Sequence, residues 1–295
     1  MDKQQQKNSA LLKLHLSVLV AGGTGLFGRL VSLQEIPLVW YRLMLTVLLF
    51  IPILYFQKKL HLLPQKTGLK LMGVGAILGV HWVFFYGSIQ ASNVSIGVIC
   101  MALLGMFTAI IDPIVNHHRF YGKEFLLSSL SLVGLLLIFH LDTRYRLGIM
   151  LGAVAQLLAA LFSVYSKKVI STEEQIPTRS VVLYEMLGGF ICLSCILPIA
   201  VHFKPELPVM PQPIDWLYLV VLALVCTIGQ YLLQFAALKH VSTFTMNLTY
   251  NLEPIYSIIL AMIIFHESRE LNASFYMGLA LIIISVLIQN LRKKK

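Results

Sequence analysis

Residues 147–167 read LGIMLGAVAQLLAALFSVYSK, a run in which no charged residue occurs before Lys167. An α-helix rises ~1.5 Å per residue, so a helix over this run can cross the ~30 Å hydrocarbon core of a bilayer. Charged residues flank the run, with Arg144 and Arg146 before it and Lys168 after it. The stretch therefore predicts a membrane-spanning helix.

The composition of the whole chain extends this interpretation. Of its 295 residues, 58% are hydrophobic and 12% are charged, and the mean hydropathy is +0.80. Soluble domains carry about 45–50% apolar and about 25% charged residues, so this chain has too little polar surface for a water-facing particle. Pro and Gly total 30 residues and no heptad pattern persists, which excludes disordered, collagen-like and coiled-coil chains. The sequence predicts an all-α polytopic membrane protein.

Apolar windows between charged or turn-rich breaks predict ten membrane-spanning helices. The first is expected to be retained rather than cleaved as a signal peptide, because no small-residue cleavage pattern follows it and Lys13 and His15 interrupt its start. The predicted spans are residues 11–31, 37–56, 68–88, 94–116, 124–141, 147–167, 179–202, 214–237, 243–265 and 272–291.

The net charge of +10 comes from Lys and Arg in the short segments between apolar runs, so it indicates membrane topology rather than a nucleic-acid partner. With ten spans and a cytoplasmic N-terminus, the inner segments hold 17 of these residues and the outer ones 4. Basic short loops are retained in the cytoplasm. Both termini are therefore expected on the cytoplasmic side of an inner or plasma membrane. The outer four are Arg144, Arg146, Lys204 and Arg269.

The chain also divides into two similar halves, residues 1–141 and 142–295. Each half has five predicted helices, an odd number, so the second half would be inserted upside down relative to the first. Inverted repeats of this kind are typical of secondary transporters, whose substrate site lies near the midplane where the repeats meet. Chance similarity between two apolar halves is the alternative. The aligned stretches are 38–44 (LVWYRLM) with 183–186 (LYEM), and 81–88 (HWVFFYGS) with 230–237 (QYLLQFAA).

A charge at the centre of a bilayer costs ~2.5–3.5 kcal/mol, so an acidic residue there needs a reason. Glu253 lies about ten residues into the ninth span, or ~15 Å deep. Pro254 lacks an N–H and should kink the helix beside it. A polar, kinked segment at this depth is stable only where it faces protein or a water-filled cavity. We expect Glu253, with Asn247 and Asn251, to handle substrate or protons; a polar helix–helix contact is the alternative.

Arg42 and Glu185 occupy matching positions in the two halves and carry opposite charges. Arg42 lies ~9 Å from the outer end of its helix and Glu185 about as far from the inner end of its own, so their levels differ by ~12 Å. A direct ion pair is therefore not expected. We predict that each acts as a gate or coupling residue with other partners, and for Arg42 the alternative is snorkelling to the outer interface.

Aromatic and amide side chains in the third and eighth spans suggest an aromatic-walled cavity for a small metabolite with a partly apolar body. They could equally be packing residues or interface anchors. Together with the ninth span they form the predicted substrate-binding set of Glu253, Asn247, Tyr250, Asn251, His81, Trp82, Tyr86, Gln230, Tyr231 and Gln234.

Three other patterns in the sequence give weaker evidence for a functional site. Cys192 and Cys195 form a C-x-x-C within an apolar run, which lacks the four ligands of a zinc site. Residues 112–118 include an Asp, an Asn and two His near the inner boundary, and we interpret them as an interfacial cluster rather than a metal site. Gly75-x-x-x-Gly79 and Gly148-x-x-x-Gly152 predict close helix contacts.

Residues 251–254 (NLEP), followed by an apolar stretch ending at His266-Glu267, resemble the EamA-type drug/metabolite transporter superfamily. Pro37 and Arg42 ahead of Pro52 are similar to that family's second helix. The resemblance implies a 5+5 inverted-repeat fold around a central cavity, and transport of small organic metabolites, often amino acids, frequently outward. The fourth helix departs from the family, because Met106 stands where a Pro is usual.

The sequence thus predicts a secondary transporter of small metabolites, with no cofactor and no enzymatic activity. It has no phosphate-binding G-x-x-x-x-G-K-[ST] loop, so transport would follow the substrate gradient or a coupled proton or ion. Glu253 and Glu185 are the carboxylates available for coupling. The alternatives are a flippase for lipids or lipid-linked intermediates, and an intramembrane lipid-modifying enzyme built on residues 112–118.

Overall fold

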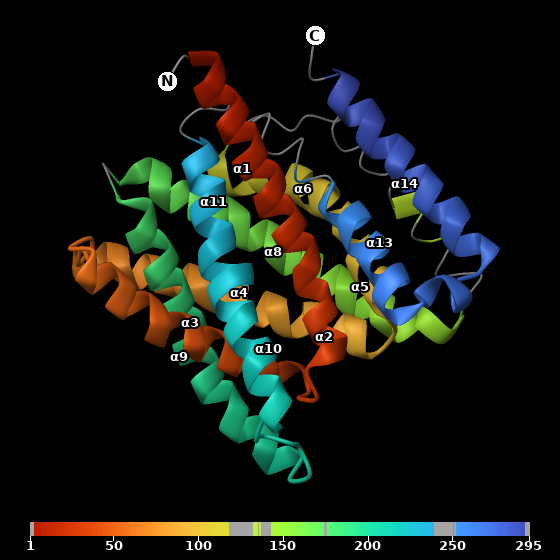
Figure 1. The fold of residues 1–295 in the computed structure, drawn as a ribbon, viewed down its shortest axis with the longest axis horizontal. Coiled ribbons are helices and arrows are strands. Elements are labelled where there is room, and N and C mark those ends of the chain that lie inside the picture. The colour runs from red at the N-terminus through yellow and green to blue at the C-terminus, as the bar shows by residue number, and fades with distance from the viewer. Residues whose placement is uncertain are drawn as a thin grey trace.

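The computed structural model describes residues 3–117, 132–134, 136, 143–173, 176–238, 250 and 252–292, and the elements assigned within them are helical (Figure 1). Among these residues, seven helices are long and apolar enough to cross a membrane, and each coincides with a predicted span. Most of the predicted fifth span, 124–141, lies outside the described residues. The seven helices are Asn8–Leu30, Glu35–Phe56, Gln65–Gln90, Val94–Asn116, Thr143–Thr172, Thr178–Phe203 and Pro213–Gln234.

Two of the spans in the first half contain a break. A 3₁₀ turn separates α1 from α2, and another separates α5 from α6. Between them, α3 and α4 are continuous helices, although α3 contains Pro52. The elements are α1 (Lys3–Gly23), η1 (Thr24–Leu26), α2 (Phe27–Leu30), α3 (Glu35–Phe56), α4 (Gln65–Gln90), α5 (Val94–Ile99), η2 (Cys100–Leu103) and α6 (Leu104–Asn116).

In the second half a π-helical turn, η4, interrupts the span formed by α10 and α11. The first turns of α1 and the last turns of α14 lie at the same end of the helical body (Figure 1). The elements are η3 (Thr143–Tyr145), α8 (Arg146–Thr172), α9 (Thr178–Phe203), α10 (Pro213–Ala223), η4 (Leu224–Gly229), α11 (Gln230–Leu238), α13 (Glu253–Phe265), η5 (Glu267–Arg269) and α14 (Ala273–Arg292).

Only the later part of the ninth span, predicted over 243–265, is described; residues 243–249 and 251 lie outside the described part. Tyr250 is helical, Leu252 is in a turn and α13 begins at Glu253. Pro254 fits the first turn of a helix, where its missing N–H would have no intrahelical acceptor. A turn therefore lies beside Pro254, where a kink was predicted.

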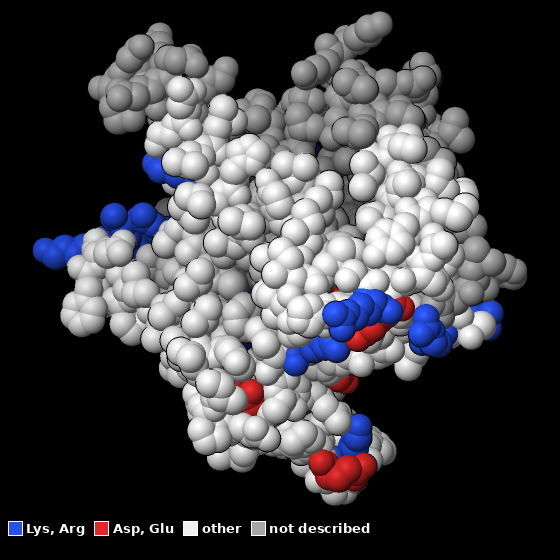
Figure 2. Space-filling model, turned by 45° about the vertical axis from the view of Figure 1, so that its right-hand side comes forward, with Lys and Arg blue, Asp and Glu red and all other residues white. Residues whose placement is uncertain are grey.

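Large apolar side chains cover the outer faces of these helices. Ile199 of α9 is 57% exposed and Ile263 of α13 is 65% exposed. A broad uncharged expanse separates basic side chains at the left of Figure 2 from a mixed acidic and basic group lower down. So large an exposed apolar surface indicates contact with lipid. The fold is that of a multi-pass membrane protein.

Helices of the two halves interleave. Helix α4 of the first half packs against α8 and α9 of the second half. Helix α1 of the first half packs against α11 and α13 of the second half (Figure 1). The main cluster of buried apolar side chains draws on α3, α4, α9 and α10. The described helices of the two halves are thus packed against one another.

Small residues allow the closest of these contacts. Gly75 of α4 lies against the backbone carbonyl of Glu185 on α9, and a Cβ at Gly79 would be 3.2 Å from the Cα of Gly189. On α8, Gly148 lies against the side chain of Ser92, and Gly152 lies against the side chain of Cys100. The close contacts predicted for both G-x-x-x-G pairs are confirmed.

Candidate functional site

Arg42 of α3 points into the protein and is only 3% exposed. Its Nε donates a hydrogen bond to Thr227 Oγ1 at 3.1 Å, and its Nη1 donates to the hydroxyl of Tyr86 at 3.1 Å. The guanidinium carbon lies 3.6 Å from the centre of the Trp82 ring, in a cation–π contact. Trp82 and Tyr86, both in the predicted set, therefore surround the Arg42 side chain.

The positive charge of Arg42 has no carboxylate partner in the described part of the chain. The snorkelling alternative is wrong, because the side chain turns toward α4 and η4 instead of the interface. A buried charge without a counter-ion is costly in a membrane protein.

Thr227, which sequence reasoning missed, lies in the π-helical turn η4. Its hydroxyl donates to the carbonyl of Leu222 at 2.9 Å, five residues back, and thereby points its lone pairs at Arg42 Nε. Single-turn π segments are frequent at functional sites. No local pattern in the sequence marks this threonine.

A second polar group joins α1, α11 and the start of the ninth span. The amide of Gln230 donates to the hydroxyl of Tyr250 at 2.8 Å and approaches Gln234 Oε1 at 3.5 Å. Ser17 of α1 is 3.3 Å from the same Tyr250 oxygen. Three predicted residues thus lie together, and Ser17 is a further member.

Glu253 and Tyr231 are further members of the predicted set. Glu253 is partly accessible, and no residue of the described part hydrogen-bonds to its carboxyl. Tyr231 lies within electrostatic range of Arg42, Glu185 and Glu253. These three ionisable side chains belong to three different helices.

Glu185 is 3% exposed and accepts a hydrogen bond from Ser166 of α8 at 2.6 Å. No ion pair joins it to Arg42 among the described residues. His81 faces α8, with Nδ1 2.8 Å from the carbonyl of Ala155. Because a carbonyl only accepts, Nδ1 must carry the proton in this contact.

Two predicted site residues, Asn247 and Asn251, lie outside the described residues. Of the cluster over 112–118, Asn116 donates to Asp112 at 2.6 Å and His117 ends α6 in a left-handed conformation. The part of the chain that the structure describes holds no group of three His, Cys, Asp or Glu side chains suited to a metal ion.

The sequence profile of the EamA-like transporter family matches residues 8–140 and, a second time, residues 146–291. The chain belongs to the EamA-like transporter family. The expected resemblance is therefore confirmed over nearly the whole chain, in two repeats. Members of this family are membrane transporters of small molecules, not enzymes.

One solved structure, described only as "Crystal structure of protein", shares the fold with a TM-score of 0.62 at 14% identity. The alignment covers 95% of this chain and 96% of the other. No curated protein matches.

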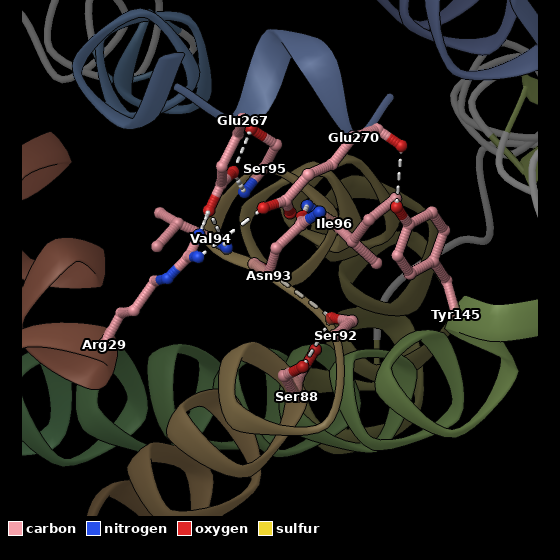
Figure 3. A network of polar contacts seen from close by, with 10 residues as sticks. All are labelled: Arg29, Ser88, Ser92, Asn93, Val94, Ser95, Ile96, Tyr145, Glu267 and Glu270. Atoms are coloured by element: carbon pink, nitrogen blue, oxygen red, sulfur yellow. Dashed lines mark hydrogen bonds and ion pairs between the residues drawn. The ribbon is translucent and has the colours of Figure 1, made fainter. Parts of the chain in front are cut away.

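The EamA-like chain has a further polar network that sequence analysis missed (Figure 3). Glu267 is fully buried and accepts hydrogen bonds from the backbone N–H groups of Val94 and Ser95, both at 2.9 Å, and from the Ser95 hydroxyl at 2.6 Å. Arg29 of α2 forms an ion pair with it at 3.0 Å. The carboxylate thus satisfies N–H groups that open α5 and have no intrahelical acceptor.

Two similar connections join the helices of opposite repeats. Asp215, third residue of α10, accepts hydrogen bonds from the hydroxyl of Ser32 and, at 3.0 Å, from its N–H. Thr67, third residue of α4, donates to Glu173 at 3.0 Å just beyond the end of α8. Pro213 followed by Asp215 is a helix-start signal that could have revealed the first connection.

Lys70 completes the second connection by donating to Glu173 at 2.9 Å. The hydrogen bonds from Lys70 and Thr67 favour the ionised carboxyl and hold the pKa of Glu173 below its ordinary value.

Proposed function

We propose that this EamA-like protein is a secondary transporter that exports small organic metabolites, such as amino acids, through a central cavity. The observation that supports this most is the burial of Arg42 and Glu185 inside the helical body, both within electrostatic range of Tyr231, as is Glu253. These side chains come from both repeats and lie on helices that are otherwise mostly apolar. Charged groups inside a membrane bundle generally mark a substrate or ion pathway.

The packing of the helices supports ten spans in two inverted repeats. A two-fold rotation that exchanges the repeats would relate α4 to α11, α8 to α1 and α6 to α13. The contact of α4 with α8 then corresponds to that of α11 with α1. The contact of α6 with α8 likewise corresponds to that of α13 with α1. All four contacts are present. Thr67 and Asp215, at the third position of α4 and α10, fit the same exchange. Five helices per repeat then require opposite insertion.

The interleaved packing also suggests which parts would move. Alternating access between sequence halves, as first expected, would have to separate α4 from α8 and α1 from α11. Two mixed groups, α1–α11–α13 and α4–α6–α8, keep those contacts. We propose that these groups rock against each other around the site.

Glu253 is the proposed coupling residue, because its carboxyl has no hydrogen-bond partner among the described residues and keeps partial accessibility. The substitution Glu253→Gln preserves size and removes ionisation. In proteoliposomes loaded with a panel of radiolabelled amino acids and other metabolites, we expect efflux by this variant to fall at least about tenfold, as for a lost proton-transfer group.

Glu206→Gln is the matched control, because Glu206 is exposed in the connection between α9 and α10. It should leave efflux unchanged. Near-normal flux by a folded Glu253→Gln protein would contradict the coupling role, and absence of flux for every compound with the unsubstituted protein would contradict transport itself.

A further inference from the structure

We infer that the transported molecule carries a carboxylate, and that Arg42 is the group that binds it. The inference rests on the proposed transport function and specifies its substrate class. Arg42 is the one Lys or Arg side chain that is buried within the described part of the chain. The described part of the site therefore has a single buried cation.

The contacts of Arg42 leave one edge of its guanidinium available. Thr227 takes the hydrogen bond from Nε, and Tyr86 takes one of the two from Nη1. Nη2 donates to no residue that the structure describes. Since no nitrogen of Arg42 is both sealed from solvent and without a partner, Nη2 must border accessible space.

The Nη1–Nη2 edge of arginine can bind a carboxylate with two parallel hydrogen bonds. Trp82 covers one face of the guanidinium, so the group is fixed in orientation before a ligand arrives. A pre-oriented fork of donors loses little freedom on binding. The geometry thus favours a planar anion approaching in the plane of the guanidinium.

Charge selects between anions. A phosphate monoester carries close to two negative charges at neutral pH, and no second buried Lys or Arg accompanies Arg42 among the described residues. Glu185 and Glu253 lie within electrostatic range of the neighbouring Tyr231 and, when ionised, would oppose a second negative charge. One carboxylate matches the single guanidinium, and the aromatic rings of Trp82, Tyr86 and Tyr231 suit an apolar body attached to it.

Matched acid and amide probes test the inference. The full-length purified protein is titrated with phenylacetate and phenylacetamide, with hexanoate and hexanamide, and with L-phenylalanine and L-phenylalaninamide, while thermal unfolding is followed. In at least one pair the acid should bind about tenfold or more tightly than the amide, as expected for a charge-assisted bidentate contact. Phenyl phosphate binding more tightly than every acid would overturn the assignment.

Variants identify the residue. Arg42→Gln should abolish the preference for the acid, whereas Arg29→Gln should keep it, because Arg29 is already paired with Glu267. If Arg42→Gln does not fold, Arg42→Lys retains the charge without the fork and should lower the preference several-fold. A preference that survives in Arg42→Gln or is undiminished in Arg42→Lys, or no preference in any pair, would overturn the inference.

Efflux of the same labelled compounds from proteoliposomes separates the two proposals. Amides that leave as fast as acids would overturn the carboxylate site and leave transport standing. An acid preference in binding with no efflux of any compound would support the site and contradict transport.

Discussion

Gly75 of α4 and Glu185 of α9 meet backbone to backbone, and a Cβ at Gly75 would overlap the carbonyl of Glu185. This contact holds the two helices close together and sets the position from which the Glu185 side chain reaches Ser166. A membrane bundle gains its stability largely from such close packing. The α4–α9 contact therefore links the stability of the fold to the placement of a site residue.

Gly75→Ala should destabilise the protein by about 1–3 kcal/mol, because the added methyl group must push α9 away. Gly73→Ala is the control, since a Cβ there meets nothing within 4 Å. It should stabilise the helix by up to about 1 kcal/mol through helix propensity. Thermal unfolding in detergent measures both, and shifts of the same sign would contradict the packing argument.

Glu267→Gln should destabilise the protein by about 2–4 kcal/mol, because two N–H groups of α5 and the Arg29 guanidinium lose a buried charged acceptor. Glu270 also pairs with Arg29, but at 3.5 Å and with 44% of its side chain exposed. Glu270→Gln should therefore cost under about 1 kcal/mol. Equal losses for the two variants, measured as midpoints of unfolding, would argue against Glu267 as the centre of the network.

The Glu173 connection should depend on pH. Hydrogen bonds lower the pKa of this carboxyl in the folded protein, so its contribution is present above the unfolded value of about 4.3 and is lost as pH falls through the lower folded value. Glu173→Gln should be less stable than the unsubstituted protein at neutral pH and equal to it in strong acid. A difference that persists in acid, or one shared by Glu206→Gln, would assign it to another cause.

The proposed orientation predicts labelling by a membrane-impermeant thiol reagent. Glu206→Cys lies in the exposed connection after α9 and Lys59→Cys in the one after α3. In intact cells the first should react and the second should react only after permeabilisation. The unsubstituted protein gives the background from Cys195, which is exposed. The opposite pattern would reverse the orientation of every helix.

The sequence predicts the long helices well because an apolar run of about twenty residues is a local signal. It also marks Trp82 and Tyr86 as candidate cavity residues, because they are amphipathic aromatic groups within a predicted span; their contact with Arg42 appears only in the structure. Thr227 could not be predicted, since its role depends on the π-helical turn and on the packing of α3 against η4. A break beside Pro254 could be predicted, since proline lacks an N–H, and a turn at Leu252 separates the helical Tyr250 from α13.

Because α1 packs against α11, its partner lies about 200 residues further along the chain. At ribosomal rates of about 5–20 residues per second, α1 waits roughly 10–40 s after its own synthesis for that partner to appear. During this interval Ser17, whose hydroxyl lies 3.3 Å from that of Tyr250 in the folded protein, faces lipid or other temporary neighbours. Biogenesis of this protein should therefore depend on factors that bind helices of the first repeat until the second repeat has been translated.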